Sequence, residues 1–142
     1  MLHNIFKFLI SRGHECRVIL HMSQKHNIQV PYIYEGVEVF GATGDVDAYR
    51  WADVIITHLD YTQYSIIMAI SAKKPIVHFV HNDIPYSSIQ SSMARTFIAY
   101  NSNWIAKKLA YNKPFVVLPP PCDVAYYDTG EQERDCITLI SL

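Results

Sequence analysis

The chain has 142 residues, of which half are hydrophobic and 18% are charged. This composition predicts one globular domain with a substantial core and excludes a disordered chain. The formal net charge of −1 gives no electrostatic basis for binding nucleic acid.

The cysteine count and the hydropathy favour a cytoplasmic protein. The three cysteines are widely spaced and odd in number, which is typical of reduced thiols rather than of a disulfide framework. No apolar run reaches the roughly 18 residues that a membrane span needs. The opening residues also lack the small-residue cleavage site of a signal peptide.

The N-terminal residues have the period of an amphipathic helix. Arg12 and Gly13 mark its expected end, because a basic last turn followed by glycine is a C-terminal helix signal. The apolar positions recur at helical spacing along one face: Leu2, Ile5, Phe6, Leu9 and Ile10.

Three apolar segments after this helix predict buried strands. They are residues 16–20, residues 37–40 between Gly36 and Gly41, and residues 52–59. The third has an unbroken apolar run, which is typical of a strand covered on both faces in a parallel sheet.

The second half of the chain repeats a pattern of helix, Lys-Pro and strand. The pattern occupies residues 64–82 and returns in residues 103–121, with a further strand at residues 96–100 between them. In each copy the proline ends the helix and opens the strand. Strands alternating with helices at this spacing predict an α/β fold with an open, Rossmann-like, doubly wound parallel sheet.

Polar residues follow each of these strands. In doubly wound sheets, ligands bind beyond the carboxyl ends of the strands. Hydroxyl, amide, imidazole and carboxylate groups gathered there suit a polyhydroxylated or phosphorylated ligand. The alternative is that loops are polar in any case and that the segment 101–103 only caps the next helix. The residues are His58 and Asp60; His81, Asn82 and Asp83; Asn101, Ser102 and Asn103; Cys122 and Asp123.

The histidines do not predict a metal site or a cofactor site. His78 and His81 are three residues apart at a strand, so we expect them to face opposite ways, with His78 packed and hydrogen-bonded in the strand. His58, His81 and Asp83 have the chemistry of zinc ligands, but we expect no metal there. The sequence contains no GxGxxG motif and no Walker loop, so it shows no nucleotide site.

Six segments, in this order, resemble the N-terminal domain of the family 4 (group 1) retaining glycosyltransferases, which have the GT-B fold. Residues 24–50 are the least typical part. The six segments are LISRGHECRVIL (9–20), ADVIITHL (52–59), KPIVHFVHND (74–83), YNSNWIAKKL (100–109), VVLPPPCDVAYYD (116–128) and CITLISL (136–142).

The resemblance implies one half of a GT-B fold that lacks its first strand. Residues 1–123 would form the N-terminal acceptor-side domain, and residues 124–142 the linker and first strand of a C-terminal domain. No residues match the family's Gly-rich diphosphate loop, or its basic pair and Glu-rich motif. We therefore expect a fragment truncated at both ends and inactive alone.

By the same resemblance, the parent enzyme transfers sugar from a nucleotide-sugar donor to a sugar or lipid-linked acceptor, with peripheral membrane association. His81 matches the family's histidine after the Pro-strand element and is the predicted catalytic residue. Asn82 and Asp83 would line the same wall. Together with the other strand-end residues they complete the predicted substrate-binding set: Asn82, Asp83, His58, Asp60, Asn101 and Ser102.

Two alternatives remain open, and one consequence follows for assembly. The chain would otherwise be a non-enzymatic flavodoxin-like binding module or a fragment of a GT-B sugar-nucleotide epimerase.

Without a first strand, residues 16–20 and the strand within 52–59 would have open edges, which invite pairing with another chain. We expect a homodimer through these edges, or pairing with the chain's own C-terminal strand.

Overall fold

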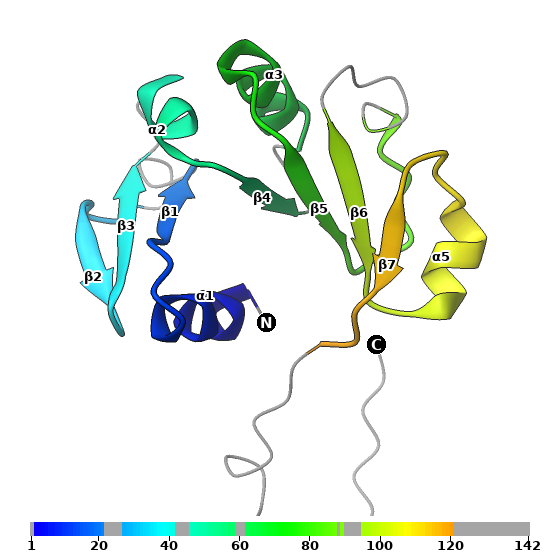
Figure 1. Ribbon diagram of the computed structural model, residues 1–142, viewed down its shortest axis with the longest axis horizontal. Helices are drawn as coiled ribbons and strands as arrows, with labels where there is room; N and C mark the ends of the chain where they lie inside the picture. The colour runs from blue at the N-terminus through cyan, green and yellow to red at the C-terminus, as the bar shows by residue number, and fades with distance from the viewer. Residues whose placement is uncertain are drawn as a thin grey trace, which may run out of the picture.

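The computed structural model describes residues 2–21, 27–41, 46–58, 62–87, 89 and 95–120. These residues form an α/β protein whose strands lie in two sheets, one of three strands and one of four (Figure 1). Residues 124–142, the predicted linker and additional strand, lie outside the described residues.

The three-stranded sheet has the order β1-β3-β2. Strand β1 (Arg17–Leu20) is parallel to β3 (Val37–Gly41), and β2 (Tyr32–Tyr34) is antiparallel to β3. Glu35 and Gly36 join β2 to β3 with φ angles of 47° and 83°. Two successive positive φ values are typical of a type I′ turn, which matches the twist of a hairpin. The sequence analysis did not predict β2.

The four-stranded sheet is parallel throughout, with the order β4-β5-β6-β7. Its strands are β4 (Ile55–His58), β5 (Ile76–Val80), β6 (Thr96–Tyr100) and β7 (Phe115–Val117). Four of the five residues of β5 are buried, and so are four of the five residues of β6. The two central strands are therefore covered on both faces, as is usual inside a parallel sheet. Coverage on both faces was predicted for β4, whose residues instead alternate between buried and half-buried.

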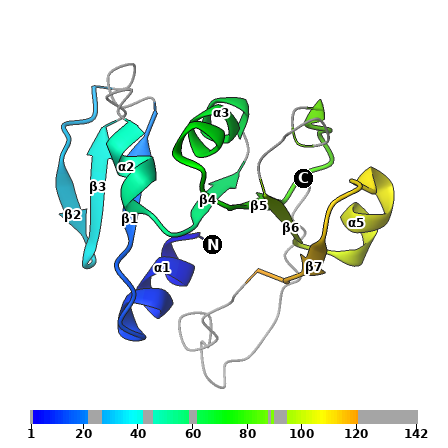
Figure 2. The ribbon, with the colours of Figure 1, turned by 45° about the horizontal axis from the view of Figure 1, so that its top comes forward.

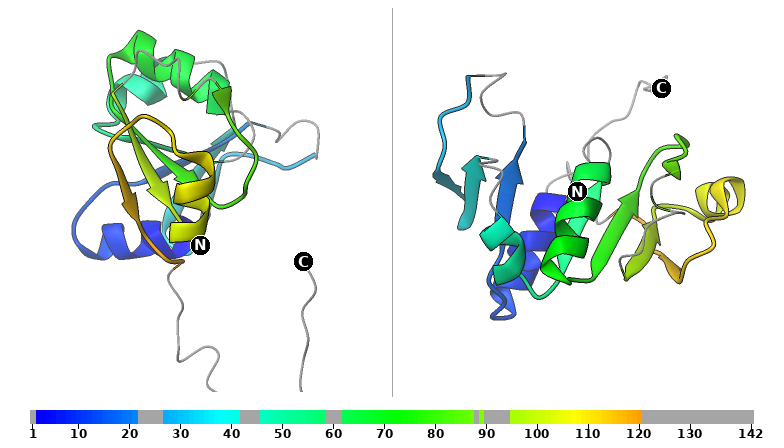
Figure 3. Two further views of the ribbon diagram at one scale, coloured as in Figure 1. Left: turned by 90° about the vertical axis from the view of Figure 1, so that its right-hand side faces the viewer. Right: turned by 90° about the horizontal axis from the view of Figure 1, so that it is seen from above.

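The helices flank these strands. They are α1 (Leu2–Ser11), α2 (Val46–Trp51), α3 (Thr62–Ala72) and α5 (Asn103–Leu109). Helix α2 packs on α3, α3 packs on β4 and β5, and α5 packs on β6. Seen from above, α3 lies between the three-stranded sheet and the strands next to α5 (Figure 3, right). The prediction of an α/β fold with a parallel sheet flanked by helices is confirmed.

The described strands form two sheets rather than the single continuous sheet that the sequence pattern predicted. Strand β1 ends one sheet and β4 ends the other, and no described strand joins them (Figures 1 and 2). The antiparallel strand β2 is a second difference from an all-parallel sheet. β1 and β4 are the two strands for which open edges were expected.

The two Lys-Pro segments have the same role in the four-stranded sheet. The carbonyl of Pro75 accepts a hydrogen bond from the Ile55 amide at 3.0 Å, and the carbonyl of Pro114 accepts one from the Ile98 amide at 2.9 Å. The prediction that each proline ends its helix is wrong: α3 ends at Ala72, before the left-handed Lys73 with φ 57°, and α5 ends at Leu109, before the left-handed Ala110 with φ 43°. Each proline therefore opens a strand through its acceptor, and the missing N–H costs no ladder bond.

The largest core cluster surrounds the four-stranded sheet. Ile19 of β1 packs against it, so apolar contact links the two sheets, although no described strand of one sheet pairs with a described strand of the other. Within the cluster, the hydroxyl of Tyr111 accepts a 2.6 Å hydrogen bond from the Tyr86 amide. The buried members of the cluster are Tyr49, Ile55, Ile66, Met68, Ala69, Ile76, Val80, Ile89, Ile98, Tyr100, Ile105 and Tyr111.

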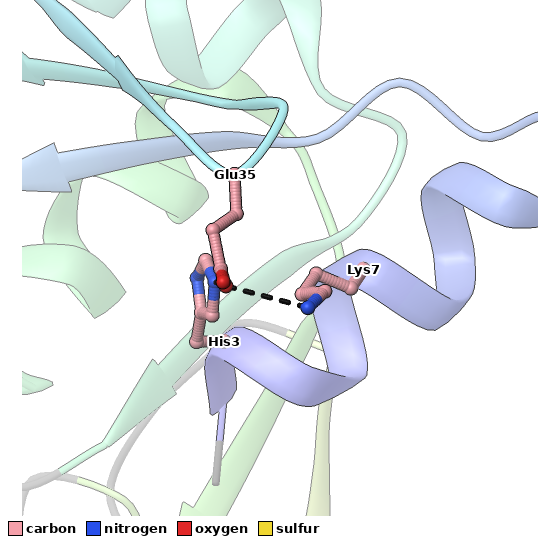
Figure 4. Close-up of polar contacts among 3 residues, drawn as sticks. All are labelled: His3, Lys7 and Glu35. Carbon is pink, nitrogen blue, oxygen red and sulfur yellow. Dashed lines mark hydrogen bonds and ion pairs between the residues drawn. The ribbon is translucent and has the colours of Figure 1, made fainter.

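Helix α1 is tied to the turn between β2 and β3 by polar contacts. Figure 4 shows His3 and Lys7 on one side of the helix, both beside the Glu35 carboxylate. The His3 Nε2 atom is 2.5 Å from Glu35 Oε2, and the Lys7 Nζ atom is 3.3 Å from the same oxygen. The hydrogen bond from His3 and then that from Lys7 lower the pKa of the exposed Glu35. Exposed ion pairs contribute little to stability, so these contacts orient α1 more than they stabilise it.

Candidate functional site

The carboxyl ends of β4, β5 and β6 lie side by side and bring three predicted site residues together. His58 is the last residue of β4, His81 follows β5, and Asn101 follows β6. The imidazole rings of His58 and His81 meet edge to face, with centroids 5.2 Å apart and planes at 78°. The parallel pairing of the strands produces this approach, because it aligns their carboxyl ends at one edge.

Asn101 fixes the backbone at this edge. Its amide N–H donates to the Val80 carbonyl at 3.1 Å, which continues the β5–β6 ladder by one residue. Its side-chain Nδ2 donates to the His81 carbonyl at 3.2 Å. The His81 backbone is thus held by the neighbouring strand, whereas its imidazole contacts His58.

Three buried polar atoms at this edge have no hydrogen-bond partner among the described residues. They are His58 Nδ1, Asn82 Oδ1 and Asn101 Oδ1. An unsatisfied buried polar group costs about 1–3 kcal/mol, so such groups are rare unless they receive a partner from solvent or a ligand. Their grouping makes this edge the strongest candidate binding site in the described part of the chain.

The two imidazoles favour the neutral form. Burial lowers the pKa of His58, and the charge of His81 lowers it further. Burial also lowers the pKa of His81. Each neutral ring carries one N–H donor and one acceptor nitrogen, so the pair can exchange hydrogen bonds with a hydroxyl group.

Asp83 is engaged by a helix that follows later in the chain. Its exposed carboxylate is 2.5 Å from the Lys108 ammonium on α5. The hydrogen bond from Lys108, followed by its charge, lowers the pKa of Asp83. Lys108 is a part of this site that the sequence analysis missed. No group of three or more His, Cys, Asp or Glu residues with metal-binding geometry occurs among the described residues.

Ser102 has the capping role that the sequence analysis left open as an alternative. It is the N-cap of α5, with extended φ and ψ of −156° and 155°, and its hydroxyl accepts the Ile105 amide at 3.3 Å. This bond satisfies one of the free amides of the first helical turn. Of the other predicted residues, Asp60, Cys122 and Asp123 lie outside the described part of the chain.

His78 lies inside the sheet rather than at its edge. Its side chain is part of the core at 1% exposure and meets the Tyr86 ring at 5.6 Å, whereas His81 meets His58. Burial, and then the charges of His58 and His81, lower the pKa of His78 to about 4, although the Thr57 backbone acts in the opposite direction. The expected packing is observed, but neither ring nitrogen makes a hydrogen bond of good geometry within the described residues.

Comparison with known proteins gave no match: no family model fits the sequence, and no curated protein and no solved structure is significantly similar to it. In the portion of the chain that the structure covers, no helix is long and apolar enough to cross a bilayer.

Proposed function

We propose that this chain is the acceptor-side domain of a nucleotide-sugar-dependent glycosyltransferase and that the carboxyl edge of the four-stranded sheet binds a sugar. The proposal combines the resemblance of the six sequence segments with the chemistry of this edge. The observation that carries it is the set of buried atoms of His58, Asn82 and Asn101 that find no hydrogen-bond partner among the residues that the structure describes.

The chemistry of these atoms favours hydroxyl groups over phosphate. The two amide oxygens are acceptors, so they need a ligand that donates hydrogen bonds. A phosphate at neutral pH offers mainly acceptors and calls for cations instead. Lys108, the nearby cation of α5, is already paired with Asp83. A polyhydroxylated ring supplies several donors at once and fits the requirement best.

The strand order supports placing these sheets in one half of a GT-B fold. In a doubly wound sheet of the dinucleotide-binding type, the first strand lies between the second and the fourth. Here β3 and β1 form one sheet, β4 to β7 form the other, and no described strand lies between β1 and β4. A first strand placed there would join the two groups in the expected order.

Within this proposal, His81 contacts the reacting sugar and His58 orients the His81 ring. The neutral His81 ring can accept or donate a hydrogen bond at the acceptor hydroxyl, and its backbone is fixed by Asn101. Positioning of the acceptor is the main contribution that the carboxyl edge of this sheet would make to glycosyl transfer. Stabilisation of the leaving diphosphate belongs to the donor domain.

The test combines binding with turnover on the purified 142-residue chain. Saturation-transfer NMR against a panel of mono- and disaccharides should detect millimolar binding, whereas UDP- and GDP-sugars should show no turnover. Asn101→Ala should weaken saccharide binding at least fivefold, and the matched control Asn4→Ala, on exposed α1, should not. Binding to no saccharide, or equal binding by the two variants, would contradict the proposal. Turnover by the chain alone would contradict the assignment of diphosphate stabilisation to another domain.

A further inference from the structure

Trp104 of α5 is an exposed aromatic residue beside the candidate site. It is 61% exposed, although tryptophan is highly buried on average. It follows Asn101 of the carboxyl edge by three positions, so their Cα atoms are at most about 11 Å apart. Ser102, between them, caps the helix that carries the indole. The exposed ring therefore borders the edge at which we place the sugar.

Two contacts restrict the orientation of this ring. The Lys108 ammonium lies 4.8 Å from the centroid of the Trp104 ring, within the range of a cation–π contact. The same ammonium is 2.5 Å from the Asp83 carboxylate. Lys108 thus covers one face of the indole and is itself anchored, whereas the other face is accessible. A side chain that is already oriented loses less entropy when a ligand binds to it.

Asp83 connects the indole to the candidate site through a short segment. It follows His81 by two positions, so their Cα atoms are at most about 7 Å apart. Asn82, between them, carries one of the buried amide oxygens that have no partner among the described residues. Residues 81–83 therefore run from the proposed sugar site to the pair of Lys108 and Trp104. A ligand that extends along this segment would reach the indole.

The accessible face of the indole suits the apolar face of a sugar ring. A sugar ring carries hydroxyl groups at its rim and C–H groups on its faces, so stacking on an indole removes apolar surface of both from water. The Trp104 N–H donates to no described residue and is available to a hydroxyl group. The Asp83 carboxylate and the Lys108 ammonium beside the ring supply an acceptor and donors that an alkyl chain could not use.

We propose that Trp104 forms a second saccharide subsite, so that the ligand of this edge is a chain of at least two sugar units. One unit binds at the carboxyl edge of the sheet, and the next stacks on Trp104 beside the pair of Asp83 and Lys108. The subsite rests on the proposed function, because it extends the same sugar site, and it adds the size of the ligand.

NMR titration of the 142-residue chain with matched pairs of saccharides tests the subsite. The pairs are glucose with maltose or cellobiose, and mannose with α1,2-mannobiose. In the pair that binds, the disaccharide should bind at least fivefold more tightly than the monosaccharide. Trp104→Ala should abolish this gain and leave the affinity for the monosaccharide within twofold. The matched control Trp51→Ala removes the other tryptophan, which has the Arg17 guanidinium 4.0 Å from its ring centroid, and should change neither affinity.

Tryptophan fluorescence reports the contact directly and does not depend on the folding of Trp104→Ala. The chain has two tryptophans, so only Trp104 emits in the variant Trp51→Phe. The disaccharide should shift this emission with the same saturation curve that the NMR titration gives. The monosaccharide, which binds at the sheet edge, should leave the emission unchanged.

Three results would overturn the subsite and leave the sugar site of the sheet edge in place. The first is equal affinity for the monosaccharide and the disaccharide. The second is an equal loss of both affinities in Trp104→Ala. The third is a gain of the same size with hexyl glucoside, which would make Trp104 a general apolar contact. Binding of no saccharide would overturn both the subsite and the proposed function.

Discussion

Buried His78 makes the stability of this protein depend on pH in a defined direction. In the folded chain the pKa of His78 falls from its ordinary value of 6.5 to about 4, chiefly through burial. Between these pH values the unfolded chain binds a proton that the folded chain excludes, so the free energy of unfolding decreases as the pH falls. The contribution is complete above pH 6.5 and is lost by about pH 4.

The size of the effect follows from the shift. One pKa unit corresponds to 1.36 kcal/mol, so the full loss is about 3 kcal/mol, with a slope near 1 kcal/mol per pH unit around pH 5. Burial lowers the pKa values of His58 and His81 as well, which adds in the same direction. A loss of this size is a large fraction of the 5–15 kcal/mol that stabilises a typical domain.

Urea unfolding followed by circular dichroism between pH 7.5 and 4.5 measures this slope. His78→Gln, which has no charge at any of these pH values, should reduce the slope by about 1 kcal/mol per pH unit near pH 5. Ile98→Val, at a fully buried position of the neighbouring strand, should lower stability by about 1 kcal/mol at every pH and leave the slope unchanged. Equal slopes for His78→Gln and the unsubstituted chain would refute the assignment.

Three further predictions concern local contacts and the proposed reaction. Ser102→Ala removes the cap of α5 and should lower the free energy of unfolding by about 1 kcal/mol, whereas Ser71→Ala, at an exposed position of α3, should change it by less than about 0.5 kcal/mol; equal losses in urea unfolding would contradict the cap. Tyr111→Phe leaves the Tyr86 amide without its acceptor and should cost about 1–3 kcal/mol, whereas Tyr34→Phe, 57% exposed, should be neutral. In an enzyme that joins this domain to a donor domain, His81→Ala should lower kcat/KM at least tenfold, about 1.4 kcal/mol of barrier, with the circular dichroism spectrum unchanged; an unchanged rate would remove His81 from the reaction.

The strands that could be predicted are those whose buried residues form a recognisable apolar pattern in the sequence. Short apolar runs predicted β1, β3, β4 and the strands after each Lys-Pro, because a strand that buries at least one face needs apolar residues on it. Strand β2 gave no such signal, since Tyr32, Ile33 and Tyr34 are all exposed. The turn from β2 to β3 could not be predicted either, because Glu35 is an unusual residue for a positive φ.

The separation into two sheets could not be predicted from local sequence patterns alone. Hydrogen bonds between strands are made by backbone groups, which every residue except proline shares, so local patterns do not tell which strands pair. The pattern predicted β1 and β4 as strands, and their open edges were expected only through the resemblance to a fold that lacks its first strand. The structure places each at the end of its own sheet.

Part of the candidate site could be predicted, because ligands of doubly wound sheets bind beyond the carboxyl ends of the strands. Parallel strands align these ends, and this alignment placed His58, His81 and Asn101 at one edge of the sheet. The ion pair between Asp83 and Lys108 was not predictable, since the two residues are 25 positions apart and belong to a loop and a separate helix. Long-range side-chain pairs of this kind depend on how the helix packs.

Histidine side-chain NMR tests the sugar site most directly. The chain has seven histidines, and selective ¹⁵N labelling of their rings reports each one during titration with the saccharide that binds best. The account predicts that the ring signals of His58 and His81 shift together with saturation in the millimolar range, whereas those of His3 and His14 stay unchanged. Saturable binding that shifts only His3 or His14, or that leaves His58 and His81 unmoved, would contradict it.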